Sequence, residues 1–350
     1  MREKVLTLIT LLVFVFIFQV AVASQLPKVG VVTTGGTIAM KYDPVKKGFV
    51  PAVTGEDLMA MAPKIKELAR IELIDLARIP SSYMDPPMWI KVSKAVNKLL
   101  EDKEVAGAVI THGTDTLEET AWFLDLTVKS PKPVICIGAM RGASEPDFDG
   151  ARNLENAVRI AISKEAIGKG TLLVLNNQIN AAREVTKTHT AQVETFKSGE
   201  FGFLGYVHAD GRIIFNRQPT RRLYFDLPEA LPRVDIISFY TGADGSYIKY
   251  AVDSGAKGIV IVGVGLGHVN PPVHDAIEAA IKAGVSVVMS TRVHTGRVQP
   301  IYSFKGGGVP LKEMGVILAD DLNPQKARIL LMLALTKTKD PKEIQKYFDQ

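Results

Sequence analysis

The chain has 350 residues, of which 47% are hydrophobic and 23% are charged, and its formal net charge is +5. This ordinary composition excludes a disordered or fibrous protein, and the length predicts two domains, or one large domain with a companion, rather than a single small core. The modest positive charge comes without a dense basic run, so the sequence gives no case for binding nucleic acid.

The N-terminus has the pattern of a targeting segment. Arg2 and Lys4 precede the dominantly apolar run 5–18, and Ala21-Val22-Ala23 is a small-x-small cleavage pattern. We therefore expect a cleaved signal peptide at residues 1–23 and a periplasmic or secreted protein without a stable membrane partner. The alternatives are a buried core helix or an uncleaved anchor, because the apolar run is nearly long enough to span a bilayer.

Residues 24–215 alternate short β-branched runs with helical patterns. This alternation predicts an α/β domain with a mostly parallel sheet covered by helices. Thr54 followed by Asp57 resembles a capping box at one helix start. The only cysteine, Cys136, lies in an apolar strand and is expected to be buried and inert. The predicted strands are 28–33, 71–76, 107–111, 134–138 and 172–176, and the predicted helices begin near Gly55, Pro86, Glu118 and Ala151.

The alternation breaks after residue 202 and restarts on a smaller scale. Segments 203–208 and 212–215 flank a short turn and predict a hairpin. Residues 216–233 hold three prolines and four arginines and are interpreted as a linker. A smaller C-terminal α/β domain is expected at residues 234–350. Its predicted strands are 234–239, 258–263 and 285–290, and its predicted helices are 247–254, 273–283 and 325–336.

Three polar, glycine-rich segments follow predicted strands, at residues 33–39, 111–118 and 263–270. In open α/β sheets, ligands bind beyond the carboxyl ends of the strands. These segments are therefore the first candidates for a functional site.

The first segment presents a threonine just past a strand end. Gly35 and Gly36 allow the backbone to turn sharply and to approach a ligand without a Cβ in the way. The turn places Thr37 directly beyond the first strand. The alternative is a plain strand–loop turn with incidental threonines.

The second segment joins a hydroxyl, a carboxylate and a glycine turn at a helix start. Thr114 and Asp115 follow a buried strand, and main-chain N–H groups at such a helix start can face an oxyanion. The alternative is a capped helix start, with Asp115 or Thr116 as the cap. His112 has no partner at metal-ligand spacing and is interpreted as structural, so no metal site is predicted.

Together with further motifs, these segments make the sequence similar to the L-asparaginase/glutaminase family, most closely to its exported type II branch. The resemblance covers the whole mature chain. It implies the family's fold, a homotetramer, and a site completed by the C-terminal domain of a neighbouring subunit. It also implies hydrolysis of a small-molecule amide by water, releasing ammonia, without a metal or an organic cofactor. The further motifs are Gly138-Ala139-Met140-Arg141, Asp149-Gly150, Val185-Thr186-Lys187-Thr188, Gly263-Val264-Gly265 and Leu322-Asn323-Pro324-Gln325-Lys326-Ala327-Arg328.

The resemblance implies a nucleophile and a second catalytic group. Thr37 matches the hydroxyl that attacks the amide carbon, and Thr114 and Lys187 match a hydroxyl–amine pair with Asp115 beside it. A threonine hydroxyl is a weak nucleophile until a base removes its proton, and a lysine serves as that base only when it is neutral. Burial favours the neutral amine and a nearby carboxylate favours the charged form. The sequence leaves both outcomes open.

The same resemblance assigns residues to substrate binding. Ser81 matches the serine that binds the substrate α-carboxylate, and main-chain groups at Thr114 and Ala139 match those that polarise the scissile carbonyl. Ser82 and His268 stand where the family has a glutamine and an asparagine around the substrate α-amino group. His268 would reach the site from the adjacent subunit.

The family's acidic contact to the α-amino group is missing. The glutamate lent by the adjacent subunit falls near Ser303, and no acid occurs between Glu278 and Glu313, where basic residues such as His294 and Arg297 stand instead. Loss of a buried charge partner costs about 2–5 kcal/mol, so a free amino acid should bind poorly unless new contacts compensate. The alternative is neutral drift in this loop.

The segment 40–51 also departs from the family. Its tyrosine that helps to activate the nucleophile is Phe49 here, and a phenyl ring cannot relay a proton. Tyr42 lies in the same segment and could replace that tyrosine from a different position. The alternative is that Tyr42 only packs this lid.

The sequence thus predicts an exported amidohydrolase that acts on asparagine or a related amide through a threonine nucleophile. One alternative is an amidase for asparagine or glutamine derivatives with a substituted α-amino group. Another is an exported ligand-binding protein, because a signal peptide and two α/β lobes also fit a solute receptor. Asparagine and glutamine differ by one methylene, which a pocket discriminates by only about 10–200-fold, and the sequence does not rank them.

Overall fold

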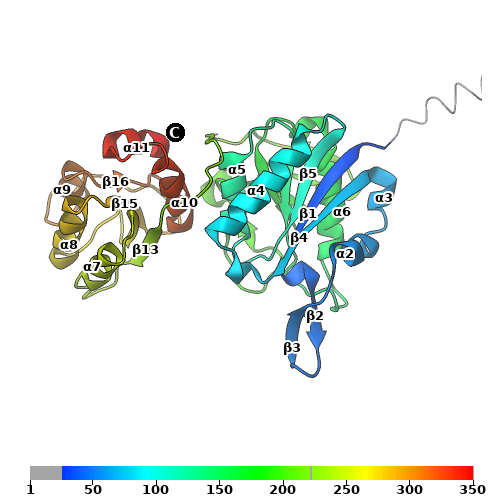
Figure 1. Cartoon of the computed structure of the whole chain (residues 1–350), viewed down its shortest axis with the longest axis horizontal. Coiled ribbons are helices and arrows are strands. Elements are labelled where there is room, and N and C mark those ends of the chain that lie inside the picture. The colour runs from blue at the N-terminus through cyan, green and yellow to red at the C-terminus, as the bar shows by residue number, and fades with distance from the viewer. Residues whose placement is uncertain (1–25, 221–222, 350) are drawn as a thin grey trace, which may run out of the picture.

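The computed structural model describes residues 26–220 and 223–349, so the predicted signal peptide at residues 1–23 lies outside it. Two α/β lobes lie side by side, the N-terminal lobe in blue to green and the C-terminal lobe in yellow to red (Figure 1). Within the described ranges, no helix has the length and apolar character needed to cross a membrane. This architecture confirms the predicted fold class.

The N-terminal lobe contains an eight-stranded sheet in the order β12-β11-β8-β7-β6-β5-β1-β4. The pairs from β4 to β7 are parallel, and β8, β11 and β12 continue the sheet in antiparallel fashion. The central strands are apolar and buried throughout, as expected for a sheet covered on both faces. The strands are β1 (Lys28–Gly35), β4 (Arg70–Ile79), β5 (Val105–Thr111), β6 (Val134–Ile137), β7 (Thr171–Leu175), β8 (Gln178–Ala181), β11 (Gly205–Val207) and β12 (Ile213–Phe215).

Helices cover both faces of this sheet. One core joins Val31 and Val109 to α2 (Gly55–Met61), α3 (Ile65–Leu68) and α6 (Gly150–Ala161). The opposite core joins Val32 and Ile110 to α4 (Pro86–Glu101) and α5 (Leu117–Thr127). The predicted capping box at Thr54 is present. Short 3-10 turns complete the lobe: η1 (Thr37–Ala39), η2 (Ser81–Tyr83), η3 (Lys164–Ala166) and η4 (Gly199–Phe201).

The C-terminal lobe repeats this arrangement with four parallel strands. The sheet order is β13-β14-β15-β16, with bounds Val234–Ser238, Gly258–Gly263, Ser286–Thr291 and Ile317–Leu318. Helices α7 (Ser246–Asp253), α8 (Pro271–Lys282) and α9 (Gly308–Glu313) pack on one face. Helices α10 (Pro324–Ala334) and α11 (Pro341–Phe348) pack on the other. Between the lobes, the described residues of 216–233 form no helix or strand.

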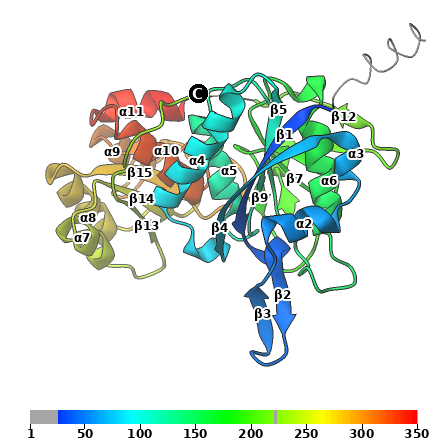
Figure 2. The same cartoon turned by 45° about the vertical axis from the view of Figure 1, so that its right-hand side comes forward.

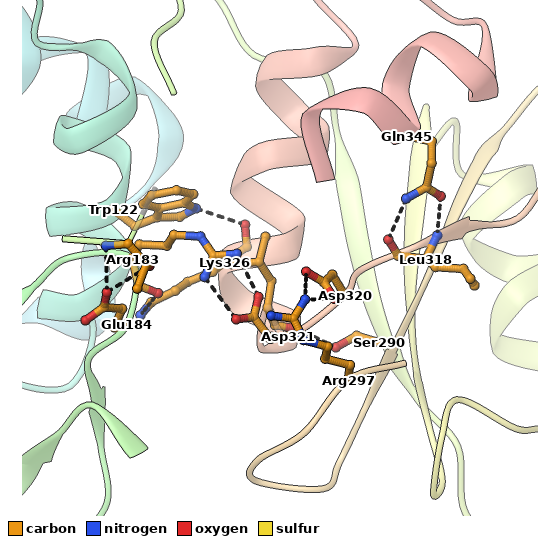
Figure 3. A network of polar contacts seen from close by, with 12 residues as sticks. Trp122, Arg183, Glu184, Ser290, Arg297, Leu318, Asp320, Asp321, Lys326 and Gln345 are labelled. Atoms are coloured by element: carbon orange, nitrogen blue, oxygen red, sulfur yellow. Dashed lines mark hydrogen bonds and ion pairs between the residues drawn. The ribbon is translucent and has the colours of Figure 1, made fainter. Parts of the chain in front are cut away.

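The two lobes share a packed interface. Helix α10 lies against α5, and the apolar side chains of both belong to one core. The indole of Trp122 donates to the carbonyl of Lys326 at 3.2 Å, and the Lys326 ammonium donates to the carbonyl of Arg183 at 2.9 Å. The Arg183 guanidinium pairs with Asp321 at 2.7 Å, and both side chains are buried. Figure 3 shows this network, which ties the start of α10 to the chain just before Lys187.

Several short elements differ from the sequence prediction. The expected lid 40–51 is a β-hairpin, β2 (Met40–Asp43) and β3 (Gly48–Pro51), that projects from the body of the lobe (Figure 2). Strand β8 follows β7 through Asn176 and Asn177, which both have positive φ, as a tight hairpin turn requires. The strands β9 (Thr186–Lys187), β10 (Phe196–Lys197) and β16, and the helices α9 and α11, were also missed, since each is short.

Candidate active site

Three loops meet at the carboxyl ends of the neighbouring strands β1, β4 and β5. Gly35 and Gly36 have φ of 104° and 83°, and the Gly36 N–H donates to the carbonyl of Ile79 at 3.0 Å. A Cβ on Gly36 would lie 2.1 Å from the Cα of Gly113. Only the absence of a side chain allows this approach. The turn leaves Thr37 half-buried as the first residue of η1.

Ser81 joins the same junction from the end of β4. A Cβ on Gly113 would lie 2.7 Å from the Ser81 hydroxyl oxygen, so the two segments are in direct contact. The Thr116 hydroxyl donates to the carbonyl of Ser81 at 2.7 Å. Ser81 is buried, whereas the next residue, Ser82, is exposed.

Thr116 occupies the cap position of α5, but its side chain does not cap the helix. Its hydroxyl turns to Ser81 instead, as does the Gly113 main chain. The alternative interpretation, in which Thr116 caps the helix, is therefore wrong. The residues at this helix start contact the loop that contains Ser81.

Hydrogen bonds join the residues that were expected to form a second catalytic group. The Lys187 ammonium nitrogen lies 2.9 Å from Thr114 Oγ1 and 2.7 Å from Asp115 Oδ1. The Lys187 side chain is 17% exposed, whereas that of Asp115 is 70% exposed. The amine thus lies mostly in the protein, and the carboxylate faces the solvent side of the group. The structure brings together the three residues that the sequence singled out.

Ala139 lies beside this group, just after β6. It is fully buried, and a Cβ on the preceding Gly138 would be 2.9 Å from Thr114 Cγ2. The carboxylate of Asp149 accepts from the Met140 N–H at 3.0 Å and holds the turn. The main chain that was expected to polarise a carbonyl is therefore fixed next to Thr114.

His112 has a structural environment, as predicted. Its Nδ1 lies 2.7 Å from the carbonyl of Gly113, and its Nε2 lies 2.9 Å from Thr120 Oγ1. Complete burial lowers the pKa of His112 to about 4, which keeps the imidazole neutral. Among residues 26–220 and 223–349, no three histidine, cysteine, aspartate or glutamate side chains gather as metal ligands. Burial also raises the pKa of the Cys136 thiol.

The lid hairpin places its aromatic residues away from polar partners. The Tyr42 ring is 52% exposed and contacts Phe49 edge-on, with ring centroids 5.8 Å apart. Phe49 packs on the main chain at Gly142, and the Tyr42 N–H donates to the Ser144 hydroxyl at 3.0 Å. In this conformation, the Tyr42 ring packs within the lid.

Of the residues expected around the substrate amino group, Ser82 follows β4 in the N-terminal lobe, whereas His268 lies on the C-terminal lobe. The ring of His268 contacts Tyr302 and Phe304, at centroid distances of 4.9 and 5.5 Å. Arg297 stands in the stretch without acids between Glu278 and Glu313, but its guanidinium pairs with Asp320 from outside that stretch. The charge of Arg297 is therefore balanced within the C-terminal lobe.

A cleft of about 870 Å³ separates the lobes beside Lys187. Lys187 and Thr188 line one wall, and Arg297 and Gln299 line the other. Thr37 and Thr114 are absent from its lining. The cleft therefore borders Lys187 but is not lined by Thr37, the residue expected to be the nucleophile.

Sequence reasoning missed the carboxylate that holds Lys187. Glu118 is buried in the first turn of α5, and its Oε2 accepts from the Lys187 N–H at 2.6 Å. Its Oε1 accepts from the Thr186 hydroxyl at 3.0 Å. An acidic residue in a first helical turn looks like an ordinary partner of the helix dipole. Its position four residues after Thr114 was the one sequence feature that could have linked Glu118 to the site.

Two family models match the chain over nearly its whole described length. The model described as "Asparaginase, N-terminal" matches residues 28–221, and that described as "Glutaminase/Asparaginase C-terminal domain" matches residues 233–348. The two matches correspond to the two lobes described above.

Relatives and a solved structure agree with these matches. The chain is 44% identical to "L-asparaginase 2" of Bacillus subtilis, covering 93% of this chain and 87% of that protein. It is 42% identical to "Probable L-asparaginase periplasmic" of Haemophilus influenzae, covering 95% of each. The structure of the "Probable Cytoplasmic L-asparaginase" from Campylobacter jejuni superposes with a TM-score of 0.86 at 41% identity, covering 93% of this chain and 99% of that one. The chain belongs to the asparaginase family and is an amidohydrolase of that type.

Proposed function

We propose that this enzyme hydrolyses the side-chain amide of asparagine, or of a related amide, to a carboxylate and ammonia, with Thr37 as the nucleophile. The observation that carries this proposal is the hydrogen-bonded group of Lys187, Thr114 and Asp115 at the same sheet edge as Thr37. A protein that only binds a ligand would not need the Lys187 amine hydrogen-bonded to the Thr114 hydroxyl at the same sheet edge as Thr37.

The reaction has two halves. The Thr37 hydroxyl attacks the amide carbon and gives up its proton, and ammonia leaves with an added proton, which produces an acyl ester on Thr37. Water then attacks the ester, and its proton passes through the Thr114 hydroxyl to Lys187, which must be a neutral amine for this step. The Thr37 oxygen leaves with a proton, and the carboxylate product departs. Main-chain N–H groups at Thr114 and Ala139 stabilise the negative oxygen that forms in each half.

The other groups of the site suit the ends of an amino-acid substrate. Ser81 would bind the α-carboxylate, and the exposed carboxylate of Asp115 would face the α-amino group. Ser82 is exposed beside this position and is shorter than the family's glutamine. No metal and no organic cofactor take part in the proposed reaction.

A second candidate is an amidase for substrates with a substituted α-amino group. His268, which we propose enters the site from the adjacent subunit, is flanked by Tyr302 and Phe304. Burial lowers the pKa of His268, and its buried Nδ1 has no hydrogen-bond partner among the described residues. A neutral imidazole can donate to the carbonyl of such a substituent, and the Tyr302 and Phe304 rings offer an apolar surface beside it.

We further propose that residues 24–215 form the catalytic domain, 216–233 the linker and 234–350 the second domain. The N-terminal pattern supports export after cleavage of residues 1–23. The relatives differ on this point, since one is described as periplasmic and another as cytoplasmic. N-terminal sequencing of the protein purified from its native host tests the proposal. A mature chain that still begins at Met1 would refute export by cleavage.

Ammonia release from a matched substrate panel tests the proposed activity. The panel holds free asparagine, free glutamine and the N-acetyl form of each, and kcat/KM is measured for every member. Release from any member supports hydrolysis, and binding without release supports the receptor alternative. A value for an N-acetyl substrate equal to or above that for the free amino acid favours the second candidate. A hundredfold preference for free asparagine would eliminate it.

A further inference from the structure

Lys187 sits on a weak structural element. Strand β9 has only two residues, Thr186 and Lys187, and pairs only with the equally short β10. A two-stranded ribbon of this size is not stable by itself. The position of the Lys187 ammonium must therefore be set by contacts outside the ribbon.

Glu118 supplies the contacts on one side. Its side chain is buried, and each of its oxygens accepts hydrogen bonds: Oε2 from the Lys187 N–H, and Oε1 from the Thr186 hydroxyl and from Asn323 Nδ2, at 2.6, 3.0 and 3.2 Å. A carboxylate only accepts hydrogen bonds, and all three of these partners donate. The burial of the charge is balanced by this set of donors.

We propose that Glu118 is a positioning residue that sets the place of the Lys187 ammonium for catalysis. The inference rests on the role proposed above for Lys187. Glu118 lies four residues after Thr114, at the start of the same helix. One rigid helix start therefore holds the main chain of Lys187 through Glu118 and meets its ammonium through Thr114 and Asp115.

The C-terminal lobe holds the same segment from the other side. The Lys326 ammonium, which is 2% exposed, donates to the carbonyls of Arg183 and Val185. Figure 3 shows Lys326 beside Arg183 in the polar network at the lobe interface. Asn323 adds its bond to Glu118. Residues 183–187 are thus clamped between α5 and the start of α10, with Lys187 at the end of the clamp.

Replacement of Glu118 by glutamine tests the positioning role with almost no change of shape. A glutamine amide has one donating end, which would face either the Lys187 N–H or the donors on Thr186 and Asn323. The Thr186 hydroxyl can rotate to accept, but either the Lys187 N–H or the Asn323 amide then faces a donor and loses its hydrogen bond. Because a misplacement of 1 Å costs about 100-fold in rate, Glu118→Gln should lower kcat by about 10–100-fold. KM should change little, since Glu118 contacts no substrate group in the proposed site.

A purely structural role for Glu118 predicts a different pattern, which a double-mutant cycle separates. If Glu118 acts through Lys187, Glu118→Gln lowers kcat in the wild type but has no further effect in Lys187→Met. If it only stabilises the folded protein, the melting temperature drops, and kcat falls by the same factor in the wild-type and Lys187→Met backgrounds. Glu119→Gln is the matched control, because it makes the same change of charge one residue along the helix, at a carboxylate that feels the charge of Arg328.

Glu118→Asp is the second variant, in case the glutamine fails to fold. It keeps the charge, but its side chain is one methylene shorter and reaches the donors less well. We therefore expect kcat to fall in the wild type and not to fall further in Lys187→Met. Equal losses of kcat in the wild-type and Lys187→Met backgrounds, or wild-type kcat in folded Glu118→Gln, would overturn the positioning role. Wild-type kcat in Lys187→Met itself would instead overturn the proposed role of Lys187. The two failures are therefore distinguishable.

Discussion

Close contact between two glycines fixes the position of Thr37, the proposed nucleophile. Gly36 and Gly113 approach so nearly that a Cβ on Gly36 would lie 2.1 Å from a main-chain atom. This contact places the loop with Thr37 against the loop with Thr114. Since both loops extend from buried strands, the separation of the two threonines is set by main chain rather than by flexible side chains.

Replacement of Gly36 by alanine should therefore disrupt the site more than the strain of a positive φ alone would. Gly36→Ala should abolish ammonia release and destabilise the fold by well over ~1 kcal/mol, because the new methyl group collides with Gly113. The matched control is Gly168→Ala, at φ 80° with open space around the Cβ. The control should lose only about 1 kcal/mol and keep its activity. Equal denaturation midpoints for the two variants would contradict this explanation.

The Lys187–Thr114 pair should behave as one unit. Lys187→Met and Thr114→Val should each lower kcat by about 10²–10⁴, the usual effect of removing a general base. Because the two groups are hydrogen-bonded at 2.9 Å, the double variant should lose little more than the worse single variant. Steady-state ammonia release measures all three. A double variant that shows the full product of both losses would count against a shared relay.

The site residues differ in how far the sequence alone could identify them. Thr37, Thr114 and Asp115 follow glycine-rich strand ends, where α/β sheets place ligands, so their pattern is visible without a relative. Lys187 lies on a two-residue strand and only the family resemblance singled it out. Glu118 was missed because its partners, including Asn323, come from distant parts of the chain.

At the scale of elements, the β2–β3 hairpin is the part of the site least fixed by packing. The two strands pair only with each other, and the hairpin projects from the lobe in Figures 1 and 2. Alternation over four residues per strand was too short to distinguish a hairpin from a loop in the sequence. Because Tyr42 is 52% exposed, we expect the hairpin to move when this residue meets Thr37.

We predict that the Tyr42 hydroxyl takes part in the reaction after such a movement. Tyr42→Phe keeps the ring contact with Phe49 and removes only the hydroxyl, so kcat should fall by about 10-fold or more, consistent with loss of a proton-transfer group. Phe203→Leu, a change at another exposed aromatic residue, serves as a control for general surface effects. Wild-type kcat in Tyr42→Phe would show that the residue only packs the lid.

At the scale of the whole molecule, the C-terminal lobe carries polar and aromatic side chains that its own lobe does not cover. Tyr302 and Phe304 remain 47% and 52% exposed, next to His268. Large exposed aromatic side chains that cluster indicate an interaction surface. The proposed partner is a second copy of the chain, whose Thr37 site they would complete.

The mature protein should therefore be at least a dimer, and we expect a tetramer of closed symmetry. Light scattering coupled to size-exclusion chromatography measures its mass in solution. Tyr302→Ala with Phe304→Ala should weaken the assembly and lower activity together. A monomeric mass with full activity would contradict the prediction of a shared site.

The order of strands and helices made the two-lobe architecture predictable, because a parallel sheet requires buried apolar strands alternating with helices. The antiparallel extension of the large sheet was predicted from the sequence only in part. The hairpin β11–β12 was predicted, but β8 was not, since its return depends on the Asn176-Asn177 turn. The contact between α5 and α10 depends on side chains more than two hundred residues apart, such as Trp122 and Lys326.

The most direct test of the account is the rate of ammonia release by Thr37→Ala, compared with wild type on the substrate that the wild type hydrolyses best. Circular dichroism and the melting temperature establish that the variant is folded. We predict that ammonia release falls to the uncatalysed background while substrate still binds, because the acyl ester cannot form without the Thr37 hydroxyl. Substantial ammonia release by the folded Thr37→Ala variant would contradict the assignment of Thr37 as the nucleophile.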